Sequence, residues 1–470
     1  MEQRPRTKME GGESPAPKGE ASTITTTEPD TAVAEATRGI QTLGVGGGAE
    51  GPTGSAETTS GAGVTSGVGE AGQAAGVGEA AAAAAAAMAT ARAVDGQGEA
   101  SSSDAGGTPP SAQEQSDDRA VLQTLFETCG GSFWRVKIAW GTAAPMMAWF
   151  GIGTCSGAGA GEKISKLSLP WNKLAGELPA ALGSLAALEE LVLNDNMLTG
   201  AIPLELCKLS ALRVLLLHNN KLAGGIPSDI GVLSSLRTVH LNNNQLTGPI
   251  PASIGDLPSL VELQLHNNKL NGTIPPAIGK LSSLRVFSLS NNQLTGNVPR
   301  EIGQLSSLVA LALDGNMLSG KPSKPPVPAE LGGLSCLQDL RLHSNRLTGN
   351  VPAEFGSLGA TRVMMLGDNQ FEGALPSEIG MATSLEILDF QKNKLSGTIP
   401  PEIGNLAALR VLSLSENTIS GEIPAELSSL SALQMLRLAN NKLTGKLPPA
   451  VAELASLKVK LLDGNRDLLE

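Results

Sequence analysis

Apolar side chains recur with a period of 24 residues through the last two thirds of the chain. In the copy around Asn244 the apolar positions are Leu233, Leu236, Val239, Leu241 and Leu246. The run Val239, His240, Leu241 alternates apolar and polar residues, which predicts a short β-strand with one buried face. A unit of this length cannot bury a core alone, so its stability has to come from packing against its neighbours. The pattern therefore predicts a solenoid.

One asparagine accompanies every copy. A buried Asn amide can hydrogen-bond loop backbone groups that have no partner in a sheet, and stacked copies let neighbouring asparagines share this task. We therefore expect a structural asparagine ladder, with intervals of 24 residues and a single interval of 29. Its members are Asn172, Asn196, Asn220, Asn244, Asn268, Asn292, Asn316, Asn345, Asn369, Asn393, Asn417, Asn441 and Asn465.

Turn signals close each copy. Gly248 permits a turn, and Pro251 restricts Ile250 to an extended path. The stretch from Leu236 to Pro251 resembles the plant-type leucine-rich repeat, Leu-x-x-Leu-x-Leu-x-x-Asn-x-Leu-x-Gly-x-Ile-Pro. The resemblance covers residues 163–470, in about 13 copies. It implies an α/β solenoid: a leucine-rich-repeat horseshoe with a concave parallel β-sheet, irregular or short helical turns on its convex side, and a flanking second sheet.

Residues 117–162 resemble the N-terminal cap of the same family. An apolar helix is expected to open at Asp118, and Trp134, Trp140 and Trp149 follow where the end of a solenoid needs covering. Secreted relatives usually pair two cysteines in this region. Cys155 is a candidate for the second, and Cys129 is the only candidate partner for it within the cap. Whether the two are bridged stays open.

Residues 1–116 have a different composition. They contain a single Leu and no Phe, Trp or Cys, and their 6 Lys/Arg and 15 Asp/Glu carry −9 of the total charge of −11. So few large apolar groups cannot offset the entropy lost on ordering, so we expect an acidic, Gly/Ala/Ser/Thr-rich disordered tail. The rest of the chain is close to neutral, which excludes a basic nucleic-acid-binding domain.

Targeting signals are not visible in the sequence. The N-terminus lacks the apolar segment of a secretory signal, and no apolar run is long enough to span a bilayer. These observations favour a cytoplasmic protein. The habit of the family that the chain resembles favours the alternative, because this repeat subtype and its cap are mostly extracellular.

The concave face is expected to carry a mixture of charged and polar side chains. Partner binding and mere solvation of this face both stay open, because Arg and aromatic anchors are scarce there. The candidate partner-binding residues are Glu190, Asp195, His218, His240, Glu262, Gln264, His266, Asp339, Arg341, His343, Asp368, Asp389, Lys392, Glu416 and Arg437.

Histidines form the most distinctive part of this set. All four are expected on strand positions facing the concavity, with His218, His240 and His266 within reach of one another because they occupy consecutive copies. A pH-sensitive or metal-binding patch, with Glu262 nearby, is one interpretation. The other, which we favour, is an ordinary exposed variant of the repeat. We expect no metal or other cofactor.

Two further motifs lie outside the repeat pattern. A five-residue insertion at 321–325 is rich in Pro and is either a tolerated loop or a ligand for proline-recognition modules. Asn271-Gly272-Thr273 is a formal glycosylation sequon, meaningful only if the chain is secreted.

The sequence contains no metalloprotease, kinase, nucleotide-binding or nucleophile-elbow motif, so we expect no catalysis. We interpret the chain as a non-catalytic interaction protein that binds a protein or peptide, acting as an intracellular scaffold or adaptor. The alternative is a secreted or cell-surface recognition or inhibitor protein that resembles receptor ectodomains. An enzyme, or a fragment of a receptor kinase, is the third and least favoured class.

Overall fold

The structure, a computed structural model, describes residues 112–155, 163–320 and 327–469, with side chains from Asp118 onward except that of Cys155. All of these residues belong to one compact unit, Asp104–Glu470. The expected disordered tail therefore lies outside the described residues as far as residue 111, and the insertion at 321–325 lies outside them too. None of the described helices has both the length and the apolar character needed to cross a bilayer.

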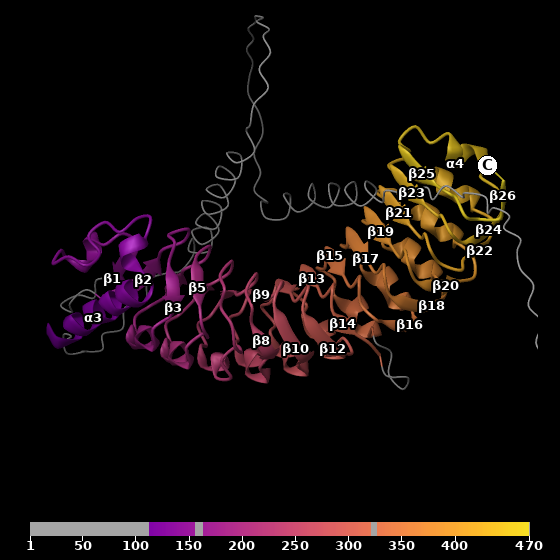
Figure 1. Ribbon diagram of the computed structural model, residues 1–470. Helices are drawn as coiled ribbons and strands as arrows, with labels where there is room; N and C mark the ends of the chain where they lie inside the picture. Colours follow the sequence, from indigo (N-terminus) through magenta and orange to yellow (C-terminus); the bar gives the residue numbers. More distant parts are fainter. Residues whose placement is uncertain (1–111, 156–162, 321–326, 470) are drawn as a thin grey trace, which may run out of the picture. The chain divides into compact units, whose positions relative to one another are not determined.

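One large sheet runs through the repeats. It has 14 strands, of which β1 pairs antiparallel with β2, and each later strand pairs parallel with the next. Figure 1 shows the strands following one another in chain order along the array. They are β1 Ile152–Cys155, β2 Lys163–Ser168, β4 Glu190–Val192, β6 Val214–Leu216, β7 Thr238–His240, β9 Glu262–Gln264, β11 Val286–Ser288, β13 Ala310–Ala312, β15 Asp339–Arg341, β17 Val363–Met365, β19 Ile387–Asp389, β21 Val411–Ser413, β23 Met435–Arg437 and β25 Val459–Leu461.

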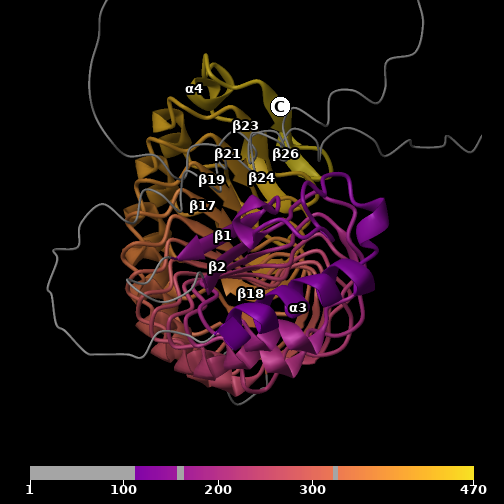
Figure 2. The ribbon, with the colours of Figure 1, turned by 90° about the vertical axis from the view of Figure 1, so that its left-hand side faces the viewer.

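Equivalent residues of successive copies face each other in this sheet. Val239 of β7 pairs with Leu263 of β9, and Leu263 pairs with Phe287 of β11. Viewed from the cap, the copies stack behind one another (Figure 2). The strand expected at Val239–Leu241 is observed one residue earlier, at Thr238–His240, with its central Val239 buried as the alternation predicts.

Shorter parallel strands form the expected flanking sheet in four pieces. They are β3 Ala175–Glu177 with β5 Met197–Thr199; β8 Thr247–Pro249, β10 Lys269–Thr273, β12 Gln293–Gly296 and β14 Met317–Leu318; β16 Thr348–Asn350, β18 Gln370–Ala374 and β20 Lys394–Ser396; and β22 Ser420–Gly421, β24 Lys442–Lys446 and β26 Asp467–Leu469. Single bridges, Ala201 to Ala223 and Ser319 to Arg346, lie between some of the pieces. The flank is therefore interrupted but regular.

Short helices occupy the convex side, most of them directly after the proline of each copy. Pro251, with φ −63° and ψ 135°, precedes one of them in the extended conformation that the Ile-Pro step predicts. The 3-10 helices are η3 Ala180–Ser184, η4 Leu204–Lys208, η5 Ile230–Val232, η6 Ala252–Asp256, η7 Pro276–Lys280, η8 Arg300–Gln304, η9 Ala329–Gly333, η10 Ala353–Ser357, η11 Ser377–Met381, η12 Pro401–Asn405 and η13 Ala425–Ser429, and the last copy has the α-helix α4 Pro449–Ala452.

Glycine allows these convex helices to approach one another closely. A Cβ atom added to Gly255 would lie 2.2 Å from the carbonyl oxygen of Ala277 in the next copy. That distance is far below van der Waals contact, so any larger residue at this position would force neighbouring copies apart.

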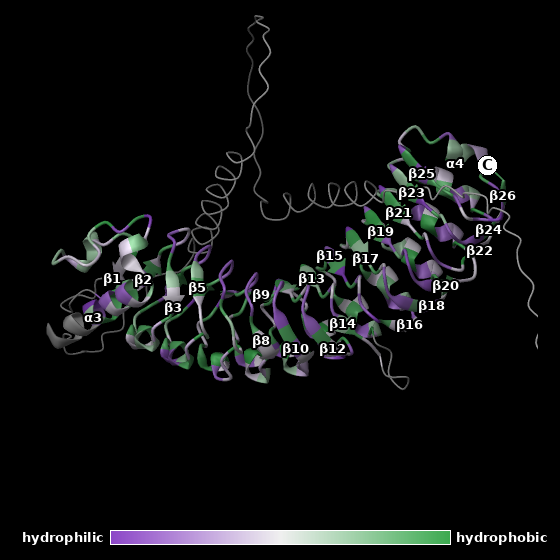
Figure 3. Ribbon diagram, in the orientation of Figure 1, coloured by the Kyte–Doolittle hydropathy of each residue, from purple (hydrophilic) through white to green (hydrophobic). Residues whose placement is uncertain are grey.

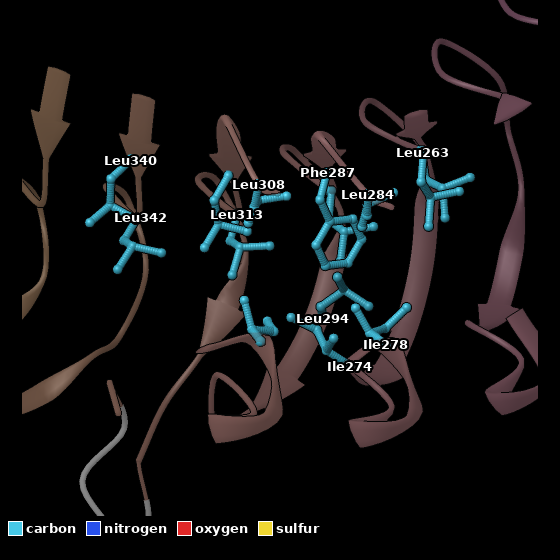
Figure 4. Close-up of a cluster of buried hydrophobic side chains, with 14 of the residues drawn as sticks. Leu263, Ile274, Ile278, Leu284, Phe287, Leu294, Leu308, Leu313, Leu340 and Leu342 are labelled. Carbon is cyan, nitrogen blue, oxygen red and sulfur yellow. The ribbon is translucent and has the colours of Figure 1, made fainter. Parts of the chain in front are cut away.

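The core lies between the large sheet and the convex helices. Within every copy, hydrophobic and hydrophilic segments alternate along the ribbon (Figure 3). Leu263, Phe287 and Leu340 are fully buried in successive parts of one continuous cluster (Figure 4). Complete burial of each such side chain contributes roughly 1.5–3 kcal/mol, so stacking supplies the stability that a single copy lacks.

The N-terminal cap closes one end of the core. It comprises α3 Ala112–Thr128, η1 Gly131–Phe133 and η2 Met146–Ala148. Trp134, Trp140 and Trp149 are 4%, 4% and 1% exposed, and the rings of Trp140 and Trp149 are 4.9 Å apart. The three tryptophans thus cover the apolar end of the solenoid. The helix begins six residues before the expected Asp118, so residues 112–116, predicted as tail, are helical.

The far end of the array is less regular. Lys460 of β25 pairs with Leu436, at a position where the other copies carry a buried apolar residue, and its side chain is exposed. This arrangement matches the degraded terminal repeat that the sequence predicts.

Candidate partner-binding surface

Asn268 illustrates how the asparagine ladder holds the strand ends in place. Its Nδ2 donates hydrogen bonds to the carbonyl oxygens of Leu241 (3.0 Å), Leu265 (3.0 Å) and His266 (3.3 Å). Its Oδ1 accepts one from the backbone N–H of Leu246 (2.9 Å). The carbonyl of Leu241 also accepts a hydrogen bond from Asn244, so neighbouring ladder residues serve the same backbone groups.

Asn172 departs from this arrangement because it joins the repeats to the cap. Its Nδ2 donates to the carbonyl oxygen of Val136 (2.8 Å), and its Oδ1 accepts from the N–H of Val136 (2.6 Å). The first ladder position thus fixes the cap loop on the array.

A second, exposed row of amides precedes the ladder in the N-terminal half. Asn243 donates to Asn219 (2.5 Å), Asn267 to Asn243 (2.6 Å) and Asn291 to Asn267 (2.8 Å). These residues have φ near 55°, a left-handed conformation that asparagine tolerates. The doubled Asn-Asn pairs at 24-residue spacing were the available signal for this row, which the sequence analysis did not identify.

Eight of the candidate residues lie on strands of the large sheet. Their side chains alternate with the buried central residue of the strand and point away from the core, as the strand pattern predicts. They are Glu190 on β4, His240 on β7, Glu262 and Gln264 on β9, Asp339 and Arg341 on β15, Asp389 on β19 and Arg437 on β23.

The remaining candidates follow the strands. Four of them, Asp195, Asp368, Lys392 and Glu416, occupy turns with φ between 53° and 58°. The expectation that all four histidines lie on strands is wrong, since only His240 does. The other three, His218, His266 and His343, lie two residues beyond the ends of β6, β9 and β15. The three-residue strands end before the chain reaches them.

Three histidines nevertheless come together on this surface. The rings of His218 and His240 lie 5.7 Å apart. The Nε2 atom of His240 is 2.9 Å from Oε2 of Glu262, and Nδ1 of His266 is 3.2 Å from Oγ of Ser288. The Nε2 atom of His218 is 3.8 Å from Oδ2 of Asp195. Stacking of consecutive copies therefore assembles a histidine–carboxylate cluster, His218, His240, His266, Asp195 and Glu262.

The environment favours the neutral form of two of these imidazoles. Burial, together with the neighbouring His240, lowers the pKa of His218 from 6.5 to about 4. Burial and His240 also lower the pKa of His266, while Asp314 opposes this change. The hydrogen bond with His240 lowers the pKa of Glu262 despite the opposing effect of burial. In the described part of the chain, no group of three His, Cys, Asp or Glu side chains is arranged to hold a metal ion.

A second polar cluster lies near the middle of the array. Arg341 donates from Nε and Nη2 to the carboxylate of Asp339, at 2.9 and 2.8 Å. The Nε2 atom of His343 is 3.7 Å from Oδ2 of Asp314, and Ser290 donates to the same carboxylate at 2.6 Å. Both ends of this cluster are partly exposed, so the groups are accessible from the concave side.

Candidate residues nearer the C-terminus are less accessible. Asp389 and Arg437 are each 4% exposed, and Ser413 between them is 1% exposed. Burial raises the pKa of Asp389, while the N–H of Gln391 (2.9 Å) and Ser413 provide opposing hydrogen bonds. The accessible polar part of the concave surface therefore lies over β4–β15, and we call this part the concave polar surface.

Cys129 is a free thiol at the base of the cap, and its Sγ lies 3.4 Å from the carbonyl oxygen of Glu177. It is therefore not bridged to Cys155 in this structure. Burial raises the pKa of Cys129 to about 11, which makes the thiol unreactive near neutral pH.

Comparisons with known proteins agree with this geometry. Residues 168–325 match the leucine-rich repeat region family, and residues 336–358 and 383–443 match two further leucine-rich repeat families. Comparison with curated proteins gives no match.

Several solved receptor structures are similar to the chain. A TDR receptor is 32% identical, with a TM-score of 0.59, and the match covers 62% of this chain and 50% of the receptor. The PEPR1–AtPEP1 structure is 30% identical, with a TM-score of 0.58 and coverages of 74% and 55%. The Arabidopsis receptor kinase HAESA, solved with the peptide hormone IDA and the co-receptor SERK1, is 34% identical, with a TM-score of 0.57 and coverages of 64% and 53%.

The chain thus spans about half the length of these receptor structures. Its repeat pattern, large parallel sheet, interrupted flanking sheet and asparagine ladder are all shared features of one repeat class. The chain is a leucine-rich-repeat protein of the plant type.

Proposed function

We propose that the chain is a non-catalytic recognition protein that binds a protein or peptide through the concave polar surface, outside the cell or at its surface. The similarity to HAESA, solved with a peptide hormone and a co-receptor, is the observation that carries this proposal. PEPR1–AtPEP1 supports it independently at 30% identity. The intracellular scaffold favoured by the sequence has no comparable support.

The geometry of the concave polar surface suits recognition. The strands that carry its side chains are held at both ends by ladder hydrogen bonds and by the packed core, so little ordering entropy is lost on binding. Glu262, Gln264 and Arg341 offer acceptors and donors on strands of fixed spacing. A partner that crosses several strands could thus form hydrogen bonds with side chains from successive copies.

Site-specific photocrosslinking tests where a partner binds. A photoreactive amino acid at Gln264 would lie on the concave polar surface, and the same amino acid at Val232, which is 62% exposed on the convex η5, is the matched control. The full chain should be incubated with extracellular fluid and, separately, with cell lysate from its native source. We expect one specific adduct from position 264 in the extracellular sample and none from position 232.

Two results would contradict the proposal in different ways. Equal labelling from both positions would exclude the concave polar surface as the binding site. A specific adduct from position 264 found only in the lysate would retain the binding surface and restore the intracellular scaffold.

A further inference from the structure

Asn271-Gly272-Thr273 is the single Asn-x-Ser/Thr sequence among the 470 residues. It forms the second half of β10 in the flanking sheet. Along β10 the exposed residues Lys269, Asn271 and Thr273 alternate with the buried Leu270 and half-buried Gly272. The acceptor asparagine and its threonine therefore both point outward from the folded array.

The surroundings of Asn271 leave room for a large substituent. In register, it is paired with Pro249 of β8 and Gln293 of β12, and both of these residues are exposed. Thr273 is paired with Thr295, which is exposed as well. No bulky side chain from the neighbouring strands covers the position.

The carboxamide of Asn271 is also chemically free. Among the described residues, no hydrogen bond involves its side chain, whereas Asn268, three residues earlier, is 9% exposed and holds four backbone groups. A substituent on the Asn268 nitrogen would break the ladder. A substituent on Asn271 would cost the fold nothing that the structure shows.

We propose that Asn271 is an N-glycosylation site, an inference that rests on the extracellular location given under Proposed function. The Nδ2 atom of Asn271 forms a bond to C1 of the first sugar, and the bond from that C1 to the phosphate oxygen of a lipid pyrophosphate-linked oligosaccharide breaks. The lipid pyrophosphate leaves, and the amide nitrogen releases one proton. The hydroxyl group of Thr273 completes the recognised sequence.

The position of the glycan has a consequence for recognition. It would cover the outer face of β8, β10 and β12, while Glu262 and Gln264 of the same copy lie on the large sheet (Figure 1). A partner can therefore reach the concave polar surface, but the middle of the flank is closed to protein contacts.

Secretion of the full chain from a glycosylating eukaryotic host, with a cleavable leader added, tests the acceptor directly. Peptide mass spectrometry with and without peptide-N-glycosidase should find the glycan on Asn271 and its conversion to Asp on release. Asn271→Gln and Thr273→Ala should lack the glycan, and Thr273→Ser should keep it. The matched control, Asn350→Gln on β16, changes an exposed flank asparagine outside any sequon and should also keep it.

Folding is checked by thermal melting, and Asn271→Gln should melt like the unchanged protein because its carboxamide makes no hydrogen bond. A folded, secreted chain with a bare Asn271 would overturn the proposed site. The chain purified from its native source separates this result from failure of the proposed function. A native extracellular chain without a glycan overturns only the site, whereas a native intracellular chain overturns the location and with it the use of the site.

Discussion

The imidazole of His240 and the carboxylate of Glu262 meet across two adjacent strands, with 2.9 Å between Nε2 and Oε2. The two residues are 22 positions apart, and only the stacking of one copy on the next brings them together. The contact lowers the pKa of Glu262, mainly through the hydrogen bond from His240. It also shows that part of the concave polar surface is organised before any partner arrives.

Replacing His240 by Ala should raise the pKa of Glu262 toward its ordinary value of 4.5, because the hydrogen bond that favours the ionised carboxylate is lost. Carboxyl-carbon NMR titration measures the change. His343→Ala, in the second polar cluster, is the control and should leave Glu262 unaffected. An unchanged Glu262 titration in His240→Ala would show that the contact does not form in solution.

His218 should make the protein less stable in mild acid. Its pKa is lowered from 6.5 to about 4, so below pH 6.5 the unfolded chain takes up a proton that the folded chain refuses until about pH 4. Stability from this group is therefore complete above pH 6.5 and is lost as the pH falls from 6.5 to about 4. Because the ring is partly exposed, we expect a loss of roughly 1–2 kcal/mol.

Urea denaturation at a series of pH values tests this prediction. His218→Gln should flatten the dependence between pH 6.5 and 4, while His343→Gln serves as the control. If the two variants kept identical profiles, the depressed pKa of His218 would be ruled out.

Asn268→Ala should lower the free energy of unfolding by about 1–3 kcal/mol, because the buried backbone groups that Asn268 serves lose their partner. Asn267→Gly is the matched control: it removes the adjacent exposed carboxamide, and glycine accepts the local φ of 55° without strain. We expect its effect to stay within about 0.5 kcal/mol. Equal losses in the two variants would contradict a special role for the ladder.

Gly255→Ala should destabilise the array by about 1–3 kcal/mol, since the new methyl group would approach the carbonyl oxygen of Ala277 to 2.2 Å. Gly333→Ala is a sharp comparison, because a Cβ atom there has no neighbour within 4 Å. Chemical denaturation of both variants measures the difference. Similar stability would mean that adjacent convex helices are further apart in solution.

Cys129 should resist alkylation in the native protein, because it is fully buried and its pKa is raised to about 11. Cys336, which is exposed, should react with iodoacetamide and acts as the internal control. Peptide mapping before and after unfolding distinguishes the two thiols. A peptide pair linking Cys129 to Cys155 would replace the free thiol with a disulfide bridge.

Local and periodic features were predictable from sequence because one rule is repeated in each copy. The period placed the ladder asparagines, the central buried residue of each strand and the tryptophans of the cap. Positions that depend on strand length were harder, since the strands end after three residues and leave His218, His266 and His343 beyond them. The start of α3 was missed because residues 112–116 share the polar composition of the preceding tail.

The amino-acid sequence by itself determined the class of fold, because a unit of 24 residues with one buried face can be stable only when copies stack. It also determined which residues face the core, since the two-residue period of a strand leaves no choice once one face is buried. Tertiary structure alone decided the chemistry of the surface. Contacts such as His240 with Glu262, the burial of Asp389 and Arg437, and the accessibility of Asn271 depend on neighbouring copies, whose spacing and curvature no single copy encodes.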